Sequence, residues 1–154
     1  MTTPLQIRRA TRADVPEIVR MLADDELGKS RERYELPLPD CYQAAFEQID
    51  GSSFFELVVA ELEGRVVGTL QLIFIPSISY QGGLRAQVES VRVDTPLRGQ
   101  GIGRQMMEWA IERARLRGAH LMQLTTHSTR LDAHRFYERL GFARSHLGMK
   151  ILLK

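Results

Sequence analysis

A glycine-rich segment in the second half of the chain has residue types and spacing that suit anion binding. Its residues are Arg98, Gly99, Gln100, Gly101, Ile102, Gly103 and Arg104. The segment lies between a predicted strand and a predicted amphipathic helix, and backbone N–H groups at a helix N-terminus can bind an anion. Glycines let a phosphate approach the backbone closely. The alternative is a tight strand-to-helix turn without a ligand, but three glycines in five residues with flanking arginines favour an anion-binding loop.

The same segment differs from two common phosphate-binding loops. A GxGxxG dinucleotide fingerprint would need glycine where Arg104 stands, and a P-loop would end in Gly-Lys followed by Ser or Thr. The spacing therefore excludes both of these loops and leaves an anionic ligand of another class.

Three further side chains could take part in chemistry. An imidazole can accept a proton near neutral pH, so His127, at the end of a predicted strand, is a candidate base, with an ordinary loop histidine as the alternative. His134 lies three residues before Tyr137 on a predicted helix and could neighbour it, although a surface position fits it equally. Cys41 has no histidine nearby in the sequence, so we do not expect it to be a nucleophile.

Hydrophobic periodicity predicts the elements that must position these residues. Alternating or β-branched runs predict strands at 5–10, 54–62, 65–75, 86–94 and 120–126, and a final hairpin at 144–153. Apolar residues at helical spacing predict helices at 14–22, 40–49, 103–114 and 131–140, the first beginning with a capping box from Asp14 to Glu17. Hairpins imply antiparallel pairs, and the strand–helix–strand unit over 86–126 implies a parallel pair. We therefore expect an α/β (α+β) fold with a mixed sheet of about six to seven strands and helices on both faces.

The composition restricts the class of protein. The 154 residues, 44% hydrophobic and 26% charged, predict one globular domain over residues 1–154. No apolar run reaches 18 residues and the first residues lack a signal-peptide stretch, so we expect a cytoplasmic protein without membrane insertion. A single cysteine excludes a disulfide framework and a multi-cysteine metal site, and we expect no metal. The net charge of +2 comes with scattered arginines, so we expect no nucleic-acid partner.

Two motifs together resemble the GNAT superfamily of acyl-CoA-dependent N-acyltransferases. Arg98-x-x-Gly101-x-Gly103, preceded by VESVRVD and a proline, is similar to the loop that binds the acyl-CoA pyrophosphate in that family. The segment AHRFYERLGF over 133–142 is similar to the family's second hallmark, a helix that carries a tyrosine and ends in Gly-Phe. The predicted element order also matches the family's order across essentially the whole chain.

The resemblance implies a cofactor site and a mechanism. Acetyl-CoA would be the acyl donor, with its pantetheine arm paired to the backbone of Val91 and Val93 where the two central parallel strands separate. Its pyrophosphate would meet the amides of residues 98–104. A primary amine would attack the thioester directly in a ternary complex. A backbone amide near Val91 would stabilise the oxyanion, and Tyr137 would be the acid for the leaving thiolate.

The resemblance also implies a base and bears on the acceptor. Glu89 resembles the position from which many family members draw the amine proton through water; the alternative is an ion pair with Arg85 or Arg92. Residues 24–40 contain six acidic and three basic side chains, where the family often places its acceptor-binding helices. This balance predicts a cationic acceptor, such as a polyamine, an amino sugar or a lysine-like amine, unless the segment is only a solvated loop.

The sequence departs from the family at one position and leaves other functions open. Many members have asparagine seven residues before the tyrosine, where it helps to hold the pantetheine, but this chain has Arg130; Ser128 or Thr129 could supply that hydrogen bond instead. A non-catalytic acyl-CoA-binding or sensing domain and a protein-modifying acetyltransferase are the alternative functions. The partners we expect are a small-molecule amine and, in a homodimer, a second copy of the chain.

Overall fold

The computed structural model describes residues 3–154 and contains a five-stranded sheet. The strands are β1 (Gln6–Arg9), β2 (Phe55–Leu62), β3 (Arg65–Pro76), β4 (Leu84–Val93) and β5 (Ala119–Gln123), in that order across the sheet. Neighbouring strands from β1 to β4 are antiparallel, and β4 and β5 are parallel. The predicted mixed sheet is therefore confirmed.

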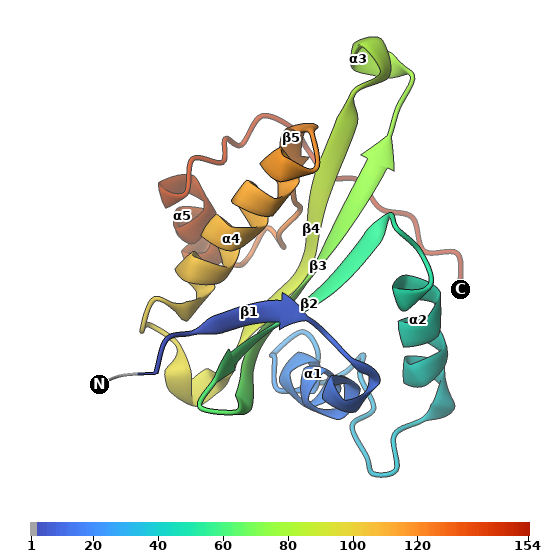
Figure 1. Ribbon diagram of the computed structural model, residues 1–154, viewed down its shortest axis with the longest axis vertical. Helices are drawn as coiled ribbons and strands as arrows, with labels where there is room; N and C mark the ends of the chain where they lie inside the picture. Colours follow the sequence, from blue (N-terminus) through green and yellow to red (C-terminus); the bar gives the residue numbers. More distant parts are fainter. Residues whose placement is uncertain (1–2) are drawn as a thin grey trace.

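Helices cover both faces of this sheet (Figure 1). They are η1 (Arg12–Asp14), α1 (Val15–Ala23), α2 (Asp40–Asp50), α3 (Ser79–Gly82), η2 (Thr95–Leu97), α4 (Ile102–Leu116) and α5 (Leu131–Arg139). Figure 1 shows α4 and α5 on one side of the sheet and α1 and α2 on the other. The short α3 forms the tip of the long β3–β4 hairpin, and its Tyr80 and Gln81 have left-handed backbone angles rather than helical ones.

The strand β2 has apolar side chains on both faces of the sheet. Val58 and Ala60 pack into the main core with α4, whereas Leu57 and Val59 contact the clusters formed with α1 and α2. Successive side chains of a strand point to opposite faces, so alternating apolar residues can bury both faces of the sheet. Met106 and Met107 of α4 are fully buried in the main core.

The strands β4 and β5 separate where the sequence analysis places the cofactor. Their paired residues end at Gln87 and Gln123, although β4 continues to Val93. In β4, Glu89 pairs with Gln71 and Arg92 pairs with Thr69, so two residues of β4 lie opposite one of β3. This is a β-bulge, and Ser90 within it has a left-handed φ of 54°. Beyond Gln87, the edge of β4 toward β5 has no strand partner among residues 3–154.

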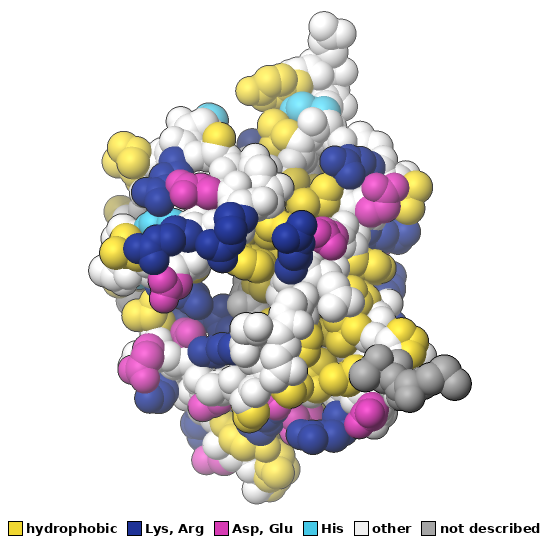
Figure 2. Space-filling model, turned by 90° about the vertical axis from the view of Figure 1, so that its left-hand side faces the viewer, with side chains coloured by type: hydrophobic (Ala, Val, Ile, Leu, Met, Phe, Trp, Pro, Cys, Tyr) yellow, Lys and Arg dark blue, Asp and Glu magenta, His cyan; other side chains and the backbone are white. Residues whose placement is uncertain are grey.

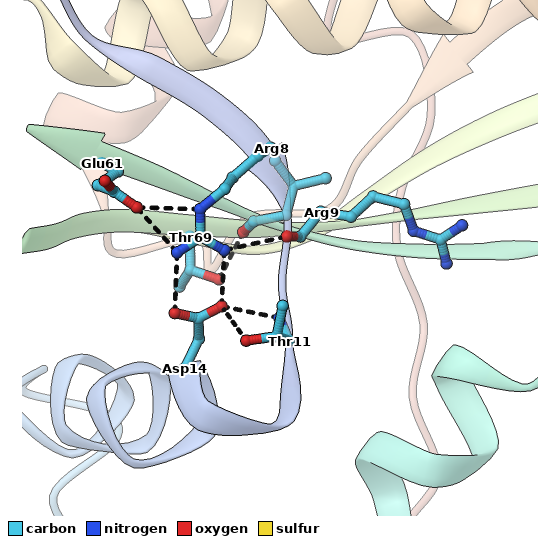
Figure 3. A network of polar contacts seen from close by, with 7 residues as sticks. Arg8, Arg9, Thr11, Asp14, Glu61 and Thr69 are labelled. Atoms are coloured by element: carbon cyan, nitrogen blue, oxygen red, sulfur yellow. Dashed lines mark hydrogen bonds and ion pairs between the residues drawn. The ribbon is translucent and has the colours of Figure 1, made fainter. Parts of the chain in front are cut away.

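A polar network fixes the first helix against the sheet (Figure 3). Arg8 donates to Asp14 at 2.8 and 3.1 Å and to Glu61 at 3.0 Å, and Asp14 also accepts the backbone N–H of Thr11 at 2.7 Å. Burial raises the pKa of Asp14, but the hydrogen bonds from Arg8 and Thr11 outweigh burial and lower it below its ordinary value. The capping box therefore joins Thr11 and Asp14, one turn before the predicted box from Asp14 to Glu17.

Two sequence predictions about the sheet are wrong. The sheet has five strands rather than six to seven, because the predicted hairpin over 144–153 does not form in the described chain. Residues 143–154 instead run from α5 toward the side of α2 without strand pairing (Figure 1). Five of their apolar side chains are more than four-fifths exposed: Leu147, Met149, Ile151, Leu152 and Leu153. A strand needs a partner for its backbone hydrogen bonds, and residues 143–154 pair neither with one another nor with the outer edge of β5.

Candidate functional site

The glycine-rich segment forms an open loop at the start of α4. Gly99 and Gly101 have left-handed φ values of 79° and 82°, and a Cβ atom on either would meet nothing within 4 Å. Gly101 is the N-cap of α4, and its carbonyl accepts the N–H of Gln105 at 3.1 Å as the first turn closes. The N–H groups of residues 102–104 precede that bond, so they have no carbonyl of this helix to bind. Open space beside free amides fits a phosphate group.

Gly103 has a different role from the other two glycines. A Cβ atom there would lie 3.5 Å from Phe136 Cζ and from Val93 Cγ2, which is ordinary van der Waals contact. A Cβ atom at Gly103 would therefore fit, and it would lie against α5 and β4 rather than in open space as at Gly99 and Gly101.

Two arginines flank this loop with their side chains already engaged. Arg98 donates its Nε–H to the carbonyl of Val93 at 3.3 Å, and Arg104 donates to Glu108 at 2.7 Å. On the side of the molecule that carries α4 and α5, basic side chains gather around a hollow in the surface (Figure 2). Polyanionic ligands would meet a positive potential on this side.

Val91 and Val93 lie on the part of β4 that has no partner on the β5 side. Both side chains are half-buried and pack against the main core. Val91 directly follows Ser90, so its amide belongs to the bulge, where the pairing with β3 shifts by one residue. The free edge of β4 ends at the strand-to-helix connection that leads to the glycine-rich loop. Strand edge and loop thus form one continuous backbone surface.

Tyr137 lies in the middle of α5, between two phenylalanines. Its ring centroid is 5.1 Å from that of Phe136 and 5.9 Å from that of Phe142. Burial raises the pKa of Tyr137, and the positive charges of Arg130 and Arg92 oppose this rise. The phenol therefore keeps its proton at neutral pH, as a general acid requires, and it lies near two guanidinium groups.

Glu89 lies in a row of polar side chains that crosses from β4 to β5. Gln87 donates its Nε2–H to Glu89 Oε1 at 2.5 Å, and Gln123 donates to Gln87 Oε1 at 2.9 Å. Among the ion pairs of residues 3–154, none joins Glu89 to Arg85 or Arg92. The alternative reading of Glu89 as half of such a pair is therefore wrong, and its carboxylate remains a candidate base.

A small apolar cavity of about 120 Å³ lies between α1, α2 and the sheet. Its polar lining consists of Thr69, Gln71 and Ser90, and the helices supply apolar side chains such as Ile18 and Phe46. Because Ser90 is the bulged residue of β4, this cavity reaches the same bulge from the face opposite α4. An acceptor entering here would meet the strand beside Glu89 and Val91.

The two histidines considered above bind local groups before α5. His127 Nδ1 lies 2.8 Å from Thr129 Oγ1, and His134 Nε2 lies 2.9 Å from the carbonyl oxygen of His127. These contacts stabilise the loop before α5. The side chain of Arg130 extends toward Asp25, with Nη2 3.8 Å from a carboxylate oxygen.

Sequence reasoning missed a cluster that forms around Asp25. Arg31, Arg92 and Arg130 all bring a guanidinium nitrogen within 4 Å of its carboxylate. These residues come from three distant parts of the chain, so no spacing could connect them. The one sequence signal was Arg130, which stands where the resembled family often has asparagine.

The described residues contain neither a cluster of metal ligands nor a membrane-spanning helix. Within residues 3–154, no group of three or more His, Cys, Asp or Glu side chains is arranged to hold a metal ion. The helices of the described chain are all too short or too polar to cross a membrane.

Comparisons with known proteins show the family of this chain. Residues 19–142 match the acetyltransferase (GNAT) family. Aminoalkylphosphonate N-acetyltransferase of Salmonella typhimurium is 33% identical over 141 residues, which cover 92% of this chain and 86% of that protein. Glucosamine 6-phosphate N-acetyltransferase of Trypanosoma brucei brucei is 34% identical over 83 residues, 54% of each protein.

A solved structure extends the likeness over the whole fold. The crystal structure of a protein from Bacillus halodurans C-125, described as a transcriptional regulator, has a TM-score of 0.95 and 52% identity, over 97% of this chain and 100% of that one. The match of residues 19–142 and the 33% identity over most of two chains are decisive. The chain belongs to the GNAT family of acetyltransferases.

Proposed function

We propose that this protein is an acetyl-CoA-dependent N-acetyltransferase that acts on a small primary amine. The observation that carries the proposal is the free edge of β4, which ends in the open glycine-rich loop at the start of α4. An extended chain with a pyrophosphate at one end fits this continuous surface, because the strand edge offers backbone pairing and the loop offers free amides.

The proposed mechanism assigns one task to each group. When bound, acetyl-CoA supplies an acetyl group activated as a thioester. The amides of residues 102–104 bind negative charge, and the Val91 amide at the bulge donates to a developing oxyanion. Glu89 accepts the proton of the acceptor ammonium through water, and Tyr137 donates a proton to the departing thiolate. The amine attacks directly, the C–N bond forms as the C–S bond breaks, and the second proton lost by the nitrogen replaces the one that Tyr137 gave, so no covalent bond to the protein forms.

The comparisons support a small acceptor. Two relatives are named for compounds that combine an amine with a phosphonate or phosphate group. The sequence predicted a cationic acceptor from the acidic residues of 24–40, but several of these carboxylates have partners in the structure. Thr95 donates to Asp24 at 2.7 Å, Lys29 pairs with Glu26 at 2.8 Å, and Asp25 lies among three arginines. These pairings weaken the case for a cationic acceptor.

Release of thiol from acetyl-CoA tests the proposed function. The protein is incubated with acetyl-CoA and a panel of amines that includes phosphonate-bearing, cationic and neutral compounds and lysine peptides. We expect many turnovers per protein with at least one small amine. Tight retention of acetyl-CoA without turnover would instead support a sensing domain, and turnover confined to peptides would support a protein-modifying enzyme.

Substitution of Glu89 tests the proposed route for the amine proton. An alkylamine with a pKa of about 10.4 is a free base in only about one molecule in 2,500 at pH 7. We expect Glu89→Gln to lower kcat/KM roughly tenfold to a hundredfold at pH 7. Part of this loss should be recovered as the pH rises toward the pKa of the amine. Glu112→Gln, at an exposed position on α4, is the control. A pH profile parallel to the wild type without loss of rate would exclude this role.

We also propose that the chain forms a homodimer through residues 143–154. A partner surface would bury the exposed apolar side chains of this segment. The strand β5 has no neighbour on its outer edge among the described residues. A second copy offers the same edge and the same segment, so a reciprocal exchange would satisfy both. We expect light scattering to give about twice the 17.6 kDa chain mass.

Charge substitution in this segment tests the dimer. Ile151→Asp combined with Leu153→Asp should give a monomer, because a carboxylate cannot be buried there without a partner. Ile78→Asp, at an equally exposed apolar residue on the hairpin tip, should leave the mass unchanged. A monomeric wild type would refute the proposal.

A further inference from the structure

Three arginine side chains converge on the single carboxylate of Asp25 without binding it closely. The shortest nitrogen–oxygen distances are 3.5 Å for Arg92, 3.8 Å for Arg130 and 3.9 Å for Arg31. Asp25 uses its Oδ2 for the backbone N–H groups of Leu27 and Gly28, both at 3.2 Å. Its main local role is thus to hold the turn after α1, and it does not saturate the guanidinium donors around it.

The same protein shows what a purely structural cluster of this kind looks like. Glu56 is buried and accepts hydrogen bonds from Arg113 at 2.6 to 3.1 Å and from Arg117 at 3.0 Å. Those bonds lower the pKa of Glu56 although burial raises it. At Glu56, two arginines and one carboxylate meet at hydrogen-bond distance. At Asp25, three guanidinium groups stand farther off, and two positive charges remain uncompensated.

Arg92 is the deepest member of the cluster and has an unused donor. Its side chain is only 10% exposed, and its Nε lies buried without a hydrogen-bond partner in the described protein. Its Nη1 donates to the carbonyl of Val91 at 2.8 Å, which fixes the group beside the bulge of β4. Burial lowers the pKa of Arg92. A buried guanidinium with an unpaired N–H is costly unless a ligand binds it.

The cluster lies beside the proposed reaction centre, on the acceptor side. Arg92 pairs with Thr69 in the sheet, and Thr69 lines the cavity between α1, α2 and the bulge. Both Arg92 and Arg130 are close enough to Tyr137 for their charges to lower its pKa. Arg130 and Arg31 are 38% and 60% exposed, so the cluster has an open side through which a ligand can enter.

We propose that Arg31, Arg92 and Arg130 bind an anionic group of the acceptor, so that the substrate class is a small amine carrying a phosphonate or phosphate. The inference rests on the proposed function and replaces the cationic acceptor predicted from the acidic segment. A tetrahedral dianion has three oxygens and up to two negative charges, which match three guanidinium groups and the surplus of two positive charges. Arginine is the side chain best suited to such a group.

The phosphates of the cofactor are a second source of the same chemistry. They are expected at the glycine-rich loop at the start of α4, whereas Arg92 reaches Asp25 in the turn after α1, which packs on the opposite face of the sheet. Variants of the cluster should therefore weaken binding of the acceptor and leave binding of CoA unchanged.

Kinetics with matched acceptors test the proposal. The probes are 2-aminoethylphosphonate and n-propylamine, which both carry a primary amine on a short chain, and the variants are Arg130→Gln and Arg31→Gln at the more exposed positions. We expect kcat/KM for the phosphonate to fall roughly tenfold or more, mainly through KM, because charge-assisted hydrogen bonds are lost. The rate with n-propylamine should fall much less than the rate with the phosphonate, and any loss shared by both amines measures the effect of Arg130 on Tyr137. Arg135→Gln, an exposed arginine of α5 outside the cluster, is the control.

A binding measurement without turnover completes the test. Calorimetric titration of CoA-saturated protein with 2-aminoethylphosphonate should show binding that weakens in both variants, while the affinity for CoA stays constant. Equal losses for both amines, or a loss of CoA affinity in the variants, would overturn the anion site. If n-propylamine is acetylated and the phosphonate is neither bound nor acetylated, the proposed function stands and this inference fails. If no amine is acetylated, the proposed function is wrong, whatever calorimetry shows for the phosphonate.

Discussion

Replacing Tyr137 with phenylalanine is expected to lower kcat about a hundredfold, the order typical for one general acid, with little change in the affinity for CoA. The phenol is half-buried beside Phe136 and Phe142, and burial raises its pKa. Because the pKa is raised, the group stays protonated through the neutral range and can donate to a thiolate. Phenylalanine keeps the aromatic packing and lacks only the proton. Single-turnover measurements of acetyl transfer check the chemical step directly.

A tyrosine outside the site provides the control. Tyr80 lies at the exposed tip of the β3–β4 hairpin, so Tyr80→Phe should leave kcat unchanged. If Tyr137→Phe has normal kcat while acetyl transfer is rate-limiting, water must protonate the thiolate and Tyr137 has only a packing role.

The second large effect is expected at Gly101. A saturating concentration of CoA, about 100 times its Kd, should stabilise the wild type by about 2.7 kcal/mol and raise Tm by roughly 5–10 °C. A valine at Gly101 would direct its side chain into the open space of the loop, where the pyrophosphate is proposed to lie. We expect Gly101→Val to abolish this shift in Tm.

Backbone strain must be separated from loss of binding in this experiment. Gly101 has a φ of 82°, so any other residue strains the backbone and lowers Tm even without ligand. Gly64, in the β2–β3 turn, has a φ of 76° and equally open surroundings, so Gly64→Val carries similar strain away from the loop. That control should have a lower Tm without ligand and keep the full shift with CoA. An equal shift for Gly101→Val and the wild type would remove the loop from the cofactor site.

Local features of the chain could be predicted from the sequence. The glycine-rich loop, the amphipathic pattern of α4 and the AHRFYERLGF segment each depend on residues close together in the chain, where spacing directly sets backbone conformation and the buried face. The order of the elements followed from the same local patterns. The separation of β4 and β5 was expected only from the family resemblance, and the ladder that ends at Gln87 agrees with it.

The remaining features depended on contacts between distant residues. The bulge at Ser90 shifts the pairing of β4 with β3 between Glu89 and Arg92, and the turn after α1 brings Asp25 and Arg31 to Arg92 and Arg130. No periodicity encodes such a meeting, because each side chain is positioned by a different element.

Residues 143–154 show the converse case. Their sequence predicts strands, yet a strand forms only where a partner completes its hydrogen bonds, and in the described residues this segment does not pair with the free edge of β5. The sequence by itself thus determined the family and predicted the loop and the acid that we propose for the cofactor site. The tertiary structure alone decided which charges meet beside the reaction centre, because long-range packing, not local spacing, sets those distances.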